Sequence, residues 1–433
     1  MKNYLLLFFV LFLLNAHAQS LYFPPKTGNT WDTISPSRLG WCPQRIDSLY
    51  NYLDNTNTKG FLILKDGKIV LEKYFGTFTQ DSIHYWASAG KSLTATMIGI
   101  AQQKGLLNIN DSVSKYLGVG WTSAGQKEKF ITIKSLLSMT SGLDDEPAFP
   151  CDNLSQEASC LQYKADVGTR WSYHTGAYRK LEDVVTAVSG QGYTAATNSY
   201  IGTKIGMSGI WLNSVFFSKA RDMARFGLLT LNKGIWQSDT VLKDTSYYRA
   251  MTNTSQNINK SYGYLWWLNG KSSFMLPQSQ LVIPFKFIPS APDDMFCAMG
   301  KNDQRIYVVP SQNIVVVRVG ESAYNSLAWS PYDTILWSYI SKLSDGCTLT
   351  SVIQKKVVND IKIFPNPANS FVSFNGFSGN GIIRYSIVNL YGQTIIENDT
   401  FNHSIDVSAL AAGQYILTLQ DDEQQAVKQF MKN

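Results

Sequence analysis

Hydrophobic and polar positions first form a regular pattern in two runs, at residues 61–65 and 68–74. Asp66-Gly67 separates them, and the glycine accepts the positive φ of a tight primed turn. The two runs therefore predict a β-hairpin. The next segment, residues 88–104, predicts a helix because its apolar side chains recur at helical spacing. These side chains are Leu93, Met97, Ile98 and Ala101.

Later patterns add further helices and strands to the predicted hairpin and helix. Further helices are predicted at residues 132–137, 180–188, 218–232 and 331–343. Strand-like runs occur at residues 262–268, 295–299, 305–309 and 314–319. Strands at both ends around a helical middle predict an α+β fold. We expect an antiparallel sheet flanked by helices, with an inserted helical domain.

The start of the chain has the pattern of a secretory signal peptide. Lys2 precedes an apolar stretch from Tyr4 to Leu14, and Ala16-His17-Ala18 forms a small-x-small cleavage site. The stretch is shorter than the ~20 apolar residues of a membrane-spanning helix, so an uncleaved anchor is the weaker interpretation. We expect an exported protein that begins at Gln19 and is not an integral membrane protein.

The pattern changes again after residue 350. Short β-like runs alternate with Asn-Gly and Ser-Gly turns, which predicts a small β-sandwich. The runs cover residues 371–374, 382–390, 404–407 and 414–419. The predicted organisation is a signal peptide (1–18), a main domain (19–350), a linker (351–360) and an all-β domain (361–433).

Composition narrows the classes of function. Hydrophobic types form 44% of the 433 residues, and 38 Lys and Arg face 32 Asp and Glu without a long basic run. This argues against a nucleic-acid partner. Four scattered histidines, and no Cys-x-x-Cys or His-Glu-x-x-His motif, disfavour a zinc enzyme. A Rossmann dehydrogenase and a P-loop ATPase are equally disfavoured. His84 and His174 are interpreted as structural, and Asp144-Asp145-Glu146 as a solvated loop.

Export permits disulfides, and the chain has five cysteines. Cys151 and Cys160 flank a short polar loop and form the first expected pair. Cys42 and Cys347 could join the two ends of the main domain. Cys297 would then be a free, buried residue in a strand. Spacing alone does not fix this connectivity.

Ser88-Ala89-Gly90-Lys91 is the candidate for chemistry. Positions i and i+3 of a helix share a face, so the lysine amine can reach the serine hydroxyl. Serine needs a base, and a lysine serves only if burial lowers its pKa. A helix start also offers N–H groups to a developing oxyanion. Ser112 and Lys115 have the same spacing but lie in a polar, solvated stretch.

The end of the chain resembles the C-terminal sorting domain of type IX secretion substrates in Bacteroidetes. The resemblance covers residues 363–368, 390–393, 405–417 and 428–432. It implies contact with the outer-membrane secretion machinery, passage from the periplasm to the surface or medium, and removal of the domain. A generic adhesive β-sandwich is the alternative.

The main domain resembles the β-lactamase-related serine hydrolases, which include class C β-lactamases, DD-peptidases, esterases and 6-aminohexanoate-oligomer hydrolases. The family's motifs occur in order: Ser88-x-x-Lys91, Leu136 to Leu143, Trp171-Ser-Tyr-His-Thr175, Arg221 to Leu228, Tyr262 to Trp267 and Phe296 to Gly300. The resemblance implies the penicillin-recognising fold and an acyl-enzyme mechanism that requires no metal or cofactor.

The resemblance also implies a role for each matching residue. Ser88 is the nucleophile, while Lys91 and Tyr173 exchange its proton. The backbone N–H groups of Ser88 and Lys301 form the oxyanion hole. The expected substrate-binding residues are Thr175, Ala298, Met299 and Gly300. Trp266 is added from the aromatic pattern: with Trp267 and Tyr264 it could wall a substrate cleft, although alternating aromatic residues in a strand are as often core.

Two departures from the family pattern bear on the substrate. Ala298-Met299-Gly300 replaces the Lys-Thr/Ser-Gly of β-lactamases, so the lysine that binds a substrate carboxylate is missing. Thr175 replaces the usual Asn or Ser. We therefore expect a small-molecule ester or amide without that carboxylate as substrate. A non-catalytic ligand-binding or sensor protein, and a true β-lactamase, stay open as alternatives.

Overall fold

The computed structural model describes residues 21–324, 331–345, 356–377, 383–400, 403–421 and 424–433. The predicted signal peptide (1–18), Cys347 and the first part of the predicted linker lie outside the described residues.

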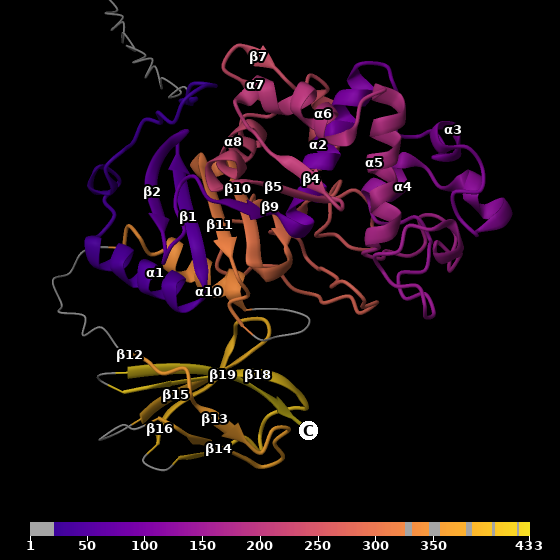
Figure 1. Cartoon of the computed structure of the whole chain (residues 1–433). Helices are drawn as coiled ribbons and strands as arrows, with labels where there is room; N and C mark the ends of the chain where they lie inside the picture. The colour runs from indigo at the N-terminus through magenta and orange to yellow at the C-terminus, as the bar shows by residue number, and fades with distance from the viewer. Residues whose placement is uncertain (1–20, 325–330, 346–355, 378–382, 401–402, 422–423) are drawn as a thin grey trace, which may run out of the picture.

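A six-stranded antiparallel sheet forms the centre of the main domain (Figure 1). Its order is β2-β1-β11-β10-β9-β8, so strands from both ends of the domain meet: Thr58 pairs with Gly320. The predicted hairpin is present, with Asp66 and Gly67 at positive φ. The strands are β1 (Thr58–Lys65), β2 (Lys68–Tyr74), β8 (Trp267–Leu268), β9 (Phe296–Gly300), β10 (Gln304–Val309) and β11 (Ile314–Gly320).

Helices cover both faces of this sheet. Gly227 in α8 (Ala220–Leu231) lies against Ile306 and Val315 on one face. On the other face, Trp337 of α10 (Tyr332–Ile340) packs on Tyr307, beside α1 (Pro43–Asn55). Residues 306 and 307 point to opposite faces because strand side chains alternate. The sheet is therefore buried on both sides.

The middle of the chain forms the helical part of the domain. Every residue from Gly90 to Ala101 of α2 is buried, so α2 is the central helix of this part. The other helices are α3 (Ser114–Leu117), α4 (Ile133–Leu137), α5 (Thr175–Ser189), α6 (Tyr193–Thr197), α7 (Thr203–Ile205) and α9 (Thr245–Met251). Small sheets comprise β3 (Ile83–Tyr85), β4 (Ile210–Leu212) and β5 (Val215–Lys219), and β6 (Ile235–Trp236) with β7 (Asp239–Thr240).

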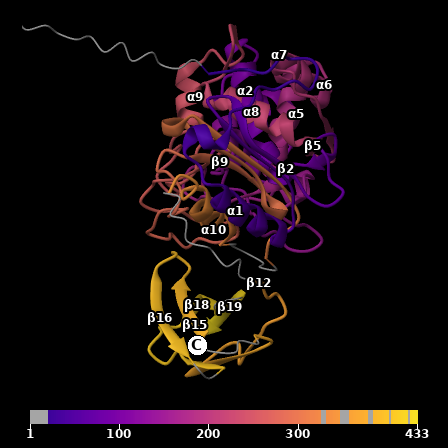
Figure 2. The same cartoon turned by 90° about the vertical axis from the view of Figure 1, so that its left-hand side faces the viewer.

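The C-terminal strands form two further sheets with their own hydrophobic core, and both views show them grouped at one end of the molecule (Figure 2). Phe374, Leu417 and Phe430 are buried there. The strands are β12 (Lys356–Val357), β13 (Lys362–Phe364), β14 (Phe371–Asn375), β15 (Ile383–Asn389), β16 (Thr394–Thr400), β17 (Ser404–Asp406), β18 (Gly413–Gln420) and β19 (Gln424–Lys432).

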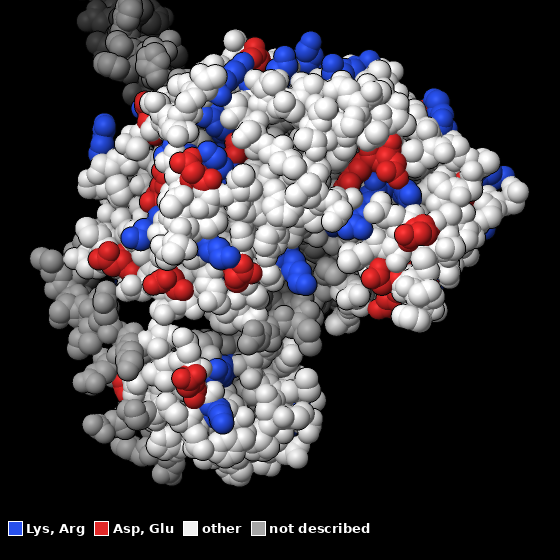
Figure 3. Space-filling view, viewed as in Figure 1, with Lys and Arg blue, Asp and Glu red and all other residues white. Residues whose placement is uncertain are grey.

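Charged side chains of both signs are interspersed on the face shown in Figure 3, with wide uncharged areas between them. Among the described residues, no helix is long and apolar enough to cross a membrane. Within the part of the chain that the structure describes, no group of three or more His, Cys, Asp or Glu side chains could hold a metal ion.

Candidate active site

Ser88 lies in a short 3-10 turn, η2 (Ala87–Ala89), that leads directly into α2. Trp86, just before the turn, is fully buried, and its Nε1 donates to Ser218 Oγ at 2.7 Å. Ala87 has a left-handed φ of 47°, a conformation that costs energy in a residue with a side chain and that clusters at active sites. Ser88 is thus held, partly exposed, at the N-terminal end of a buried helix.

Lys91 reaches Ser88 from the first turn of α2. Its Nζ lies 3.0 Å from Ser88 Oγ, and the residue is only 4% exposed. Burial lowers the pKa of Lys91 from 10.5 to about 7; the Glu182 carboxylate opposes this shift and the Arg179 guanidinium adds to it. A large fraction of Lys91 is therefore neutral near pH 7, as a proton acceptor must be.

Tyr173 approaches from the segment just before α5. The Ser88 side chain is near enough to the Tyr173 phenol to oppose the rise of its pKa, and the Tyr173 ring centroid lies 5.0 Å from Lys91 Nζ. Burial raises the pKa of Tyr173 to about 12, so the phenol keeps its proton at neutral pH and can donate it. Trp267 stacks on the same ring at 5.9 Å. The structure brings the three predicted catalytic side chains together.

The end of β9 lies against the turn η2. A Cβ atom on Gly300 would lie 2.2 Å from the Trp86 carbonyl oxygen, so this close approach requires glycine. Arg305 Nη1 donates to the Gly300 carbonyl oxygen at 2.8 Å. Because this carbonyl belongs to the same planar peptide as the Lys301 N–H, Arg305 fixes the direction of that N–H.

The predicted substrate-binding residues differ in their exposure. Met299 on β9 is partly exposed, and so is Thr175, the first residue of α5. Ala298 is 0% exposed and pairs with Ile306 in the sheet. The side chain at position 298 is therefore shielded from solvent, unlike that of Met299.

Trp266 does not lie where the sequence analysis predicts. It is 0% exposed and packs on Phe226 and Phe296 at centroid distances of 5.9 and 5.1 Å. Its neighbour Trp267 contacts Tyr173 instead. Trp266 is therefore a core residue and is not available to contact a substrate from solvent.

Two residues near Lys91 were not singled out from the sequence. The Tyr178 ring centroid lies 4.6 Å from Lys91 Nζ, so two tyrosine rings flank the amine. Glu182 lies one turn further along α5 and is 8% exposed. Burial raises the pKa of Glu182. The i, i+4 spacing of Tyr178 and Glu182 was the signal that both share a face of α5.

The contacts of the two histidines and of the acidic run 144–146 show the role of each. His174 caps α5, because its Nδ1 accepts from Ala177 N at 3.4 Å, and the His84 ring faces the Gly320 carbonyl. Both contacts are structural. Asp145, by contrast, is 1% exposed and pairs with Arg170 at 2.6 Å. Its interpretation as part of a solvated loop is wrong, since a buried carboxylate of this kind needs its cation.

The first expected disulfide is present. Cys151 and Cys160 are bonded, with their Cα atoms 5.4 Å apart. Cys297 is a free, buried residue in β9, also as expected. The expected Cys42–Cys347 pair involves residue 347, which lies outside the described residues.

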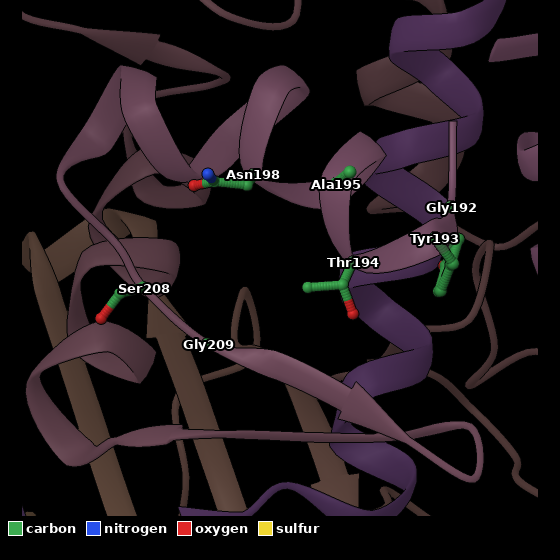
Figure 4. Close-up of a pocket in the computed structure, with 7 residues that line it drawn as sticks. All are labelled: Gly192, Tyr193, Thr194, Ala195, Asn198, Ser208 and Gly209. Carbon is green, nitrogen blue, oxygen red and sulfur yellow. The ribbon is translucent and has the colours of Figure 1, made fainter. Parts of the chain in front are cut away.

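The lining of a pocket of about 520 Å³ does not include Ser88. Thr194, Asn198 and Ser208 are among the residues that line it (Figure 4). Tyr193 also lines the pocket. Its hydroxyl shares a hydrogen bond of 2.6 Å with Oγ1 of Thr94, a residue of α2. This pocket contains none of the predicted catalytic residues, so we do not assign the substrate to it.

Comparisons with known protein families cover both parts of the chain. Residues 57–328 match the family described as beta-lactamase. Residues 362–433 match the family described as secretion system C-terminal sorting domain. The second match indicates type IX secretion, to the cell surface or the medium, and implies contact with the secretion machinery.

Individual relatives agree with the first match. A Bacillus subtilis protein provisionally named penicillin-binding protein PbpX is 30% identical over 177 residues, which are 38% of this chain and 44% of that protein. The alignment thus spans less than half of that relative. The 6-aminohexanoate-dimer hydrolase of Paenarthrobacter ureafaciens is 24% identical over 276 residues, which are 54% of this chain and 70% of the relative.

A solved structure shares the fold. A Bacillus anthracis protein provisionally described as a 6-aminohexanoate-dimer hydrolase superposes with a TM-score of 0.56 at 19% identity, over 74% of this chain and 87% of that one. The α+β class predicted for the main domain is confirmed by this likeness. The chain therefore belongs to the beta-lactamase family of serine hydrolases and carries a type IX sorting domain at its C-terminal end.

Proposed function

We propose that this protein is an exported serine hydrolase that cleaves an ester or amide bond through an acyl-enzyme on Ser88. The observation that carries the proposal is the contact between Lys91 Nζ and Ser88 Oγ at 3.0 Å. It occurs in a site where Lys91 is 4% exposed. A hydroxyl with a buried amine at hydrogen-bond distance is the arrangement of an activated nucleophile.

Acylation begins with neutral Lys91. Its amine accepts the Ser88 proton while Oγ attacks the substrate carbonyl carbon. The oxygen of the tetrahedral intermediate accepts hydrogen bonds from the backbone N–H groups of Ser88 and Lys301. When the intermediate collapses, the Tyr173 phenol protonates the leaving alcohol or amine, and Lys91 returns a proton to Tyr173. Ser88 is then an ester, and Lys91 is neutral again.

Deacylation uses the same groups in reverse order. Water attacks the acyl carbon, and its proton passes to Lys91, directly or through Tyr173. The Ser88 oxygen leaves as an alkoxide and takes this proton back. The product is a carboxylic acid, and the free enzyme is regenerated.

The substrate we propose lacks the carboxylate that β-lactamases bind. Position 298 is a buried alanine rather than a lysine, so no cation is available there. Similarity to a protein named 6-aminohexanoate-dimer hydrolase favours a linear amide or ester. For export, the signal-like residues 1–18 would direct the first membrane crossing and the sorting domain the second.

Labelling of the purified protein with a fluorophosphonate probe tests the nucleophile. We expect stoichiometric labelling of the wild type and none in Ser88→Ala or Lys91→Ala. Ser112→Ala is the matched control, because Ser112 has the same spacing to Lys115 but Lys115 Nζ is bound to Asp111 at 2.7 Å. Equal labelling of Ser88→Ala and wild type would contradict the proposal.

Substrate class is tested with p-nitrophenyl esters, aminohexanoate dimers, D-amino-acid amides and nitrocefin. We expect turnover of an ester or amide and none of nitrocefin. The similarity to a penicillin-binding protein makes a β-lactam-binding protein the second candidate. Stable acylation by a β-lactam without release of product would favour that candidate, and rapid nitrocefin hydrolysis would identify a β-lactamase.

A further inference from the structure

The loop closed by the Cys151–Cys160 disulfide, called here the disulfide loop, lies directly against the segment that carries Tyr173. Tyr173 itself belongs to no helix or strand, so its position depends on contacts from elsewhere in the chain. One side of the segment is held by Ser172 N, which donates to the Met139 carbonyl at 2.9 Å. The other side is held by the disulfide loop.

Asn153 supplies the contacts from this loop. Its Nδ2 donates to the Tyr173 carbonyl oxygen at 3.0 Å and to the Asp145 carbonyl oxygen at 3.0 Å. Its Oδ1 accepts from Thr175 N at 3.0 Å. One amide side chain therefore joins the backbone on both sides of His174, immediately beside the phenol that contacts Ser88.

Backbone atoms of the loop strengthen this attachment. The Asn153 carbonyl accepts from Gly176 N at 2.7 Å, and the Leu154 carbonyl accepts from Arg179 Nη1 at 2.9 Å. A Cβ on Gly176 would lie 1.9 Å from the Ser155 carbonyl oxygen, so the two segments touch with no room for a side chain. The loop thus satisfies the first two N–H groups of α5, which a helix leaves without partners.

We propose that Asn153 is a positioning residue that holds Tyr173 against Ser88 and Lys91, and that the Cys151–Cys160 disulfide keeps Asn153 in place. The inference rests on the proposed function, because it assigns Asn153 a role through Tyr173. The disulfide joins two cysteines that lie nine residues apart in the sequence, and this restricts the conformations that the loop between them can adopt. Catalysis in this protein is therefore coupled to formation of that disulfide.

Two variants separate positioning from simple helix capping. Asn153→Asp keeps an acceptor for Thr175 N and adds a negative charge that the helix N-terminus favours, but it loses both donor bonds, to the Tyr173 and Asp145 carbonyls. Asn153→Ala loses all three side-chain bonds. We expect both to lower kcat about 10- to 100-fold with KM changed less than about 2-fold, since small displacements of catalytic groups have effects of this size. Asp should lower the thermal midpoint less than Ala does, because it keeps the bond to Thr175 N.

The pH profile gives a second readout. A displaced Tyr173 ring lets water reach Lys91, which raises the Lys91 pKa toward its ordinary value. We therefore expect the acid limb of kcat/KM to move up by about one pH unit in Asn153→Ala. Ser159→Ala, at an exposed position of the same loop, is the control and should match wild type in rate and profile.

The role of the disulfide is tested with Cys151→Ser/Cys160→Ser. We expect the same loss of kcat as in Asn153→Ala, and no further loss when the three substitutions are combined, because they act through one contact. Wild-type kcat and pH profile in Asn153→Asp would overturn the role of Asn153. Wild-type kcat in the double serine variant would overturn the coupling to the disulfide. If the wild type is not labelled at Ser88, the proposed function fails instead.

Discussion

A serine followed three residues later by a lysine occurs at Ser88 and Lys91 and again at Ser112 and Lys115, but only the first lysine is buried. Lys115 also follows a serine by three residues, but its side chain is 61% exposed and paired with Asp111. Lys91 is 4% exposed between two tyrosine rings. Burial disfavours the charged form of an amine, so only Lys91 can serve as a base near neutral pH.

The first prediction concerns the rate of acylation. Because Lys91 must lose its proton to act and its pKa is about 7, we expect the rate of Ser88 labelling to rise with pH up to about 7 and then to level off. Labelling rates measured from pH 5 to pH 9 check this. A plateau that begins only near pH 10 would mean that Lys91 has an ordinary pKa.

The same shift predicts a pH dependence of stability. Between the folded pKa of about 7 and the unfolded value of ~10.4, the unfolded chain binds a proton that the folded protein lacks. Lys91 therefore makes the free energy of unfolding rise with pH in this window, by up to about 1.4 kcal/mol per unit. Urea unfolding of wild type and Lys91→Met at pH 7 and 9 measures this. Met should be the less pH-dependent of the two, and equal dependence would contradict the prediction.

Sequence reasoning found Ser88, Lys91 and Tyr173 because motif spacing and order identify side chains that can meet. It assigned Trp266 to the substrate cleft wrongly, because the aromatic pattern does not show that both Trp266 and Trp267 are buried. It did not single out Asn153 either, since its bonds are to backbone atoms distant in sequence. Such contacts leave no pattern along the chain.

At the scale of elements, the site depends on how closely β9 approaches the turn η2. Gly300 is the residue at their contact, and an added Cβ would overlap the Trp86 carbonyl oxygen. This oxygen is part of the backbone and cannot move aside like a side chain. Any larger residue at 300 must therefore separate the two proposed oxyanion donors.

We accordingly expect Gly300→Ala to slow Ser88 labelling by about 10²- to 10³-fold, the usual effect of losing an oxyanion donor. Gly192→Ala is the matched control, because a Cβ there meets nothing within 4 Å. Both variants are compared by labelling rate and by circular dichroism. A Gly300→Ala protein that is folded and labelled at the wild-type rate would contradict this account.

Most helices and strands were predictable where the apolar residues follow a single period, either that of a strand or that of a helix. The β1–β2 hairpin and α2 follow from alternation and from helical spacing. The predicted strand at residues 262–268 is reduced to β8 (Trp267–Leu268), because Leu265 has a φ of 58°. This turn is held by tertiary bonds, from Ser92 Oγ to the Leu265 carbonyl at 2.6 Å and from Leu265 N to the Leu137 carbonyl at 3.0 Å. Local sequence does not encode such bonds.

At the scale of the molecule, the described residues form two separate hydrophobic clusters. One lies around the six-stranded sheet and α2, and the other lies within the sorting domain. A ring contact between Phe285 and Tyr391 at 5.3 Å links the two parts. Such a contact contributes about 1 kcal/mol, which is small beside the burial within each cluster.

We therefore predict that a chain of residues 19–355 folds and is labelled at Ser88 at the wild-type rate. Its thermal midpoint should lie close to that of the hydrolase transition in the full chain. Labelling kinetics and calorimetry of both chains check this, with Ser88→Ala of the short chain as the blank. An unfolded or unlabelled short chain would show that the sorting domain contributes to the active site or its stability.

The organisation of the whole molecule was largely legible from the sequence, because the change in pattern after residue 350 is sharp. The strands β12, β13, β16 and β19 were not among the predicted runs, and β12 (Lys356–Val357) lies within the predicted linker. In β19 the buried residues Ala426 and Phe430 are four positions apart, so simple alternation is weak. Pairing with β18 places this strand in the sheet, and that partner is invisible to a local pattern.

The pairing of β1 with β11 also constrains when this protein can acquire its structure. The central sheet is complete only when Thr58 pairs with Gly320, and contacts between residues so distant in sequence form slowly. During synthesis the emerging polypeptide lacks its final partner strand until most of it has been translated. The central sheet therefore cannot be completed until residue 320 has left the ribosome.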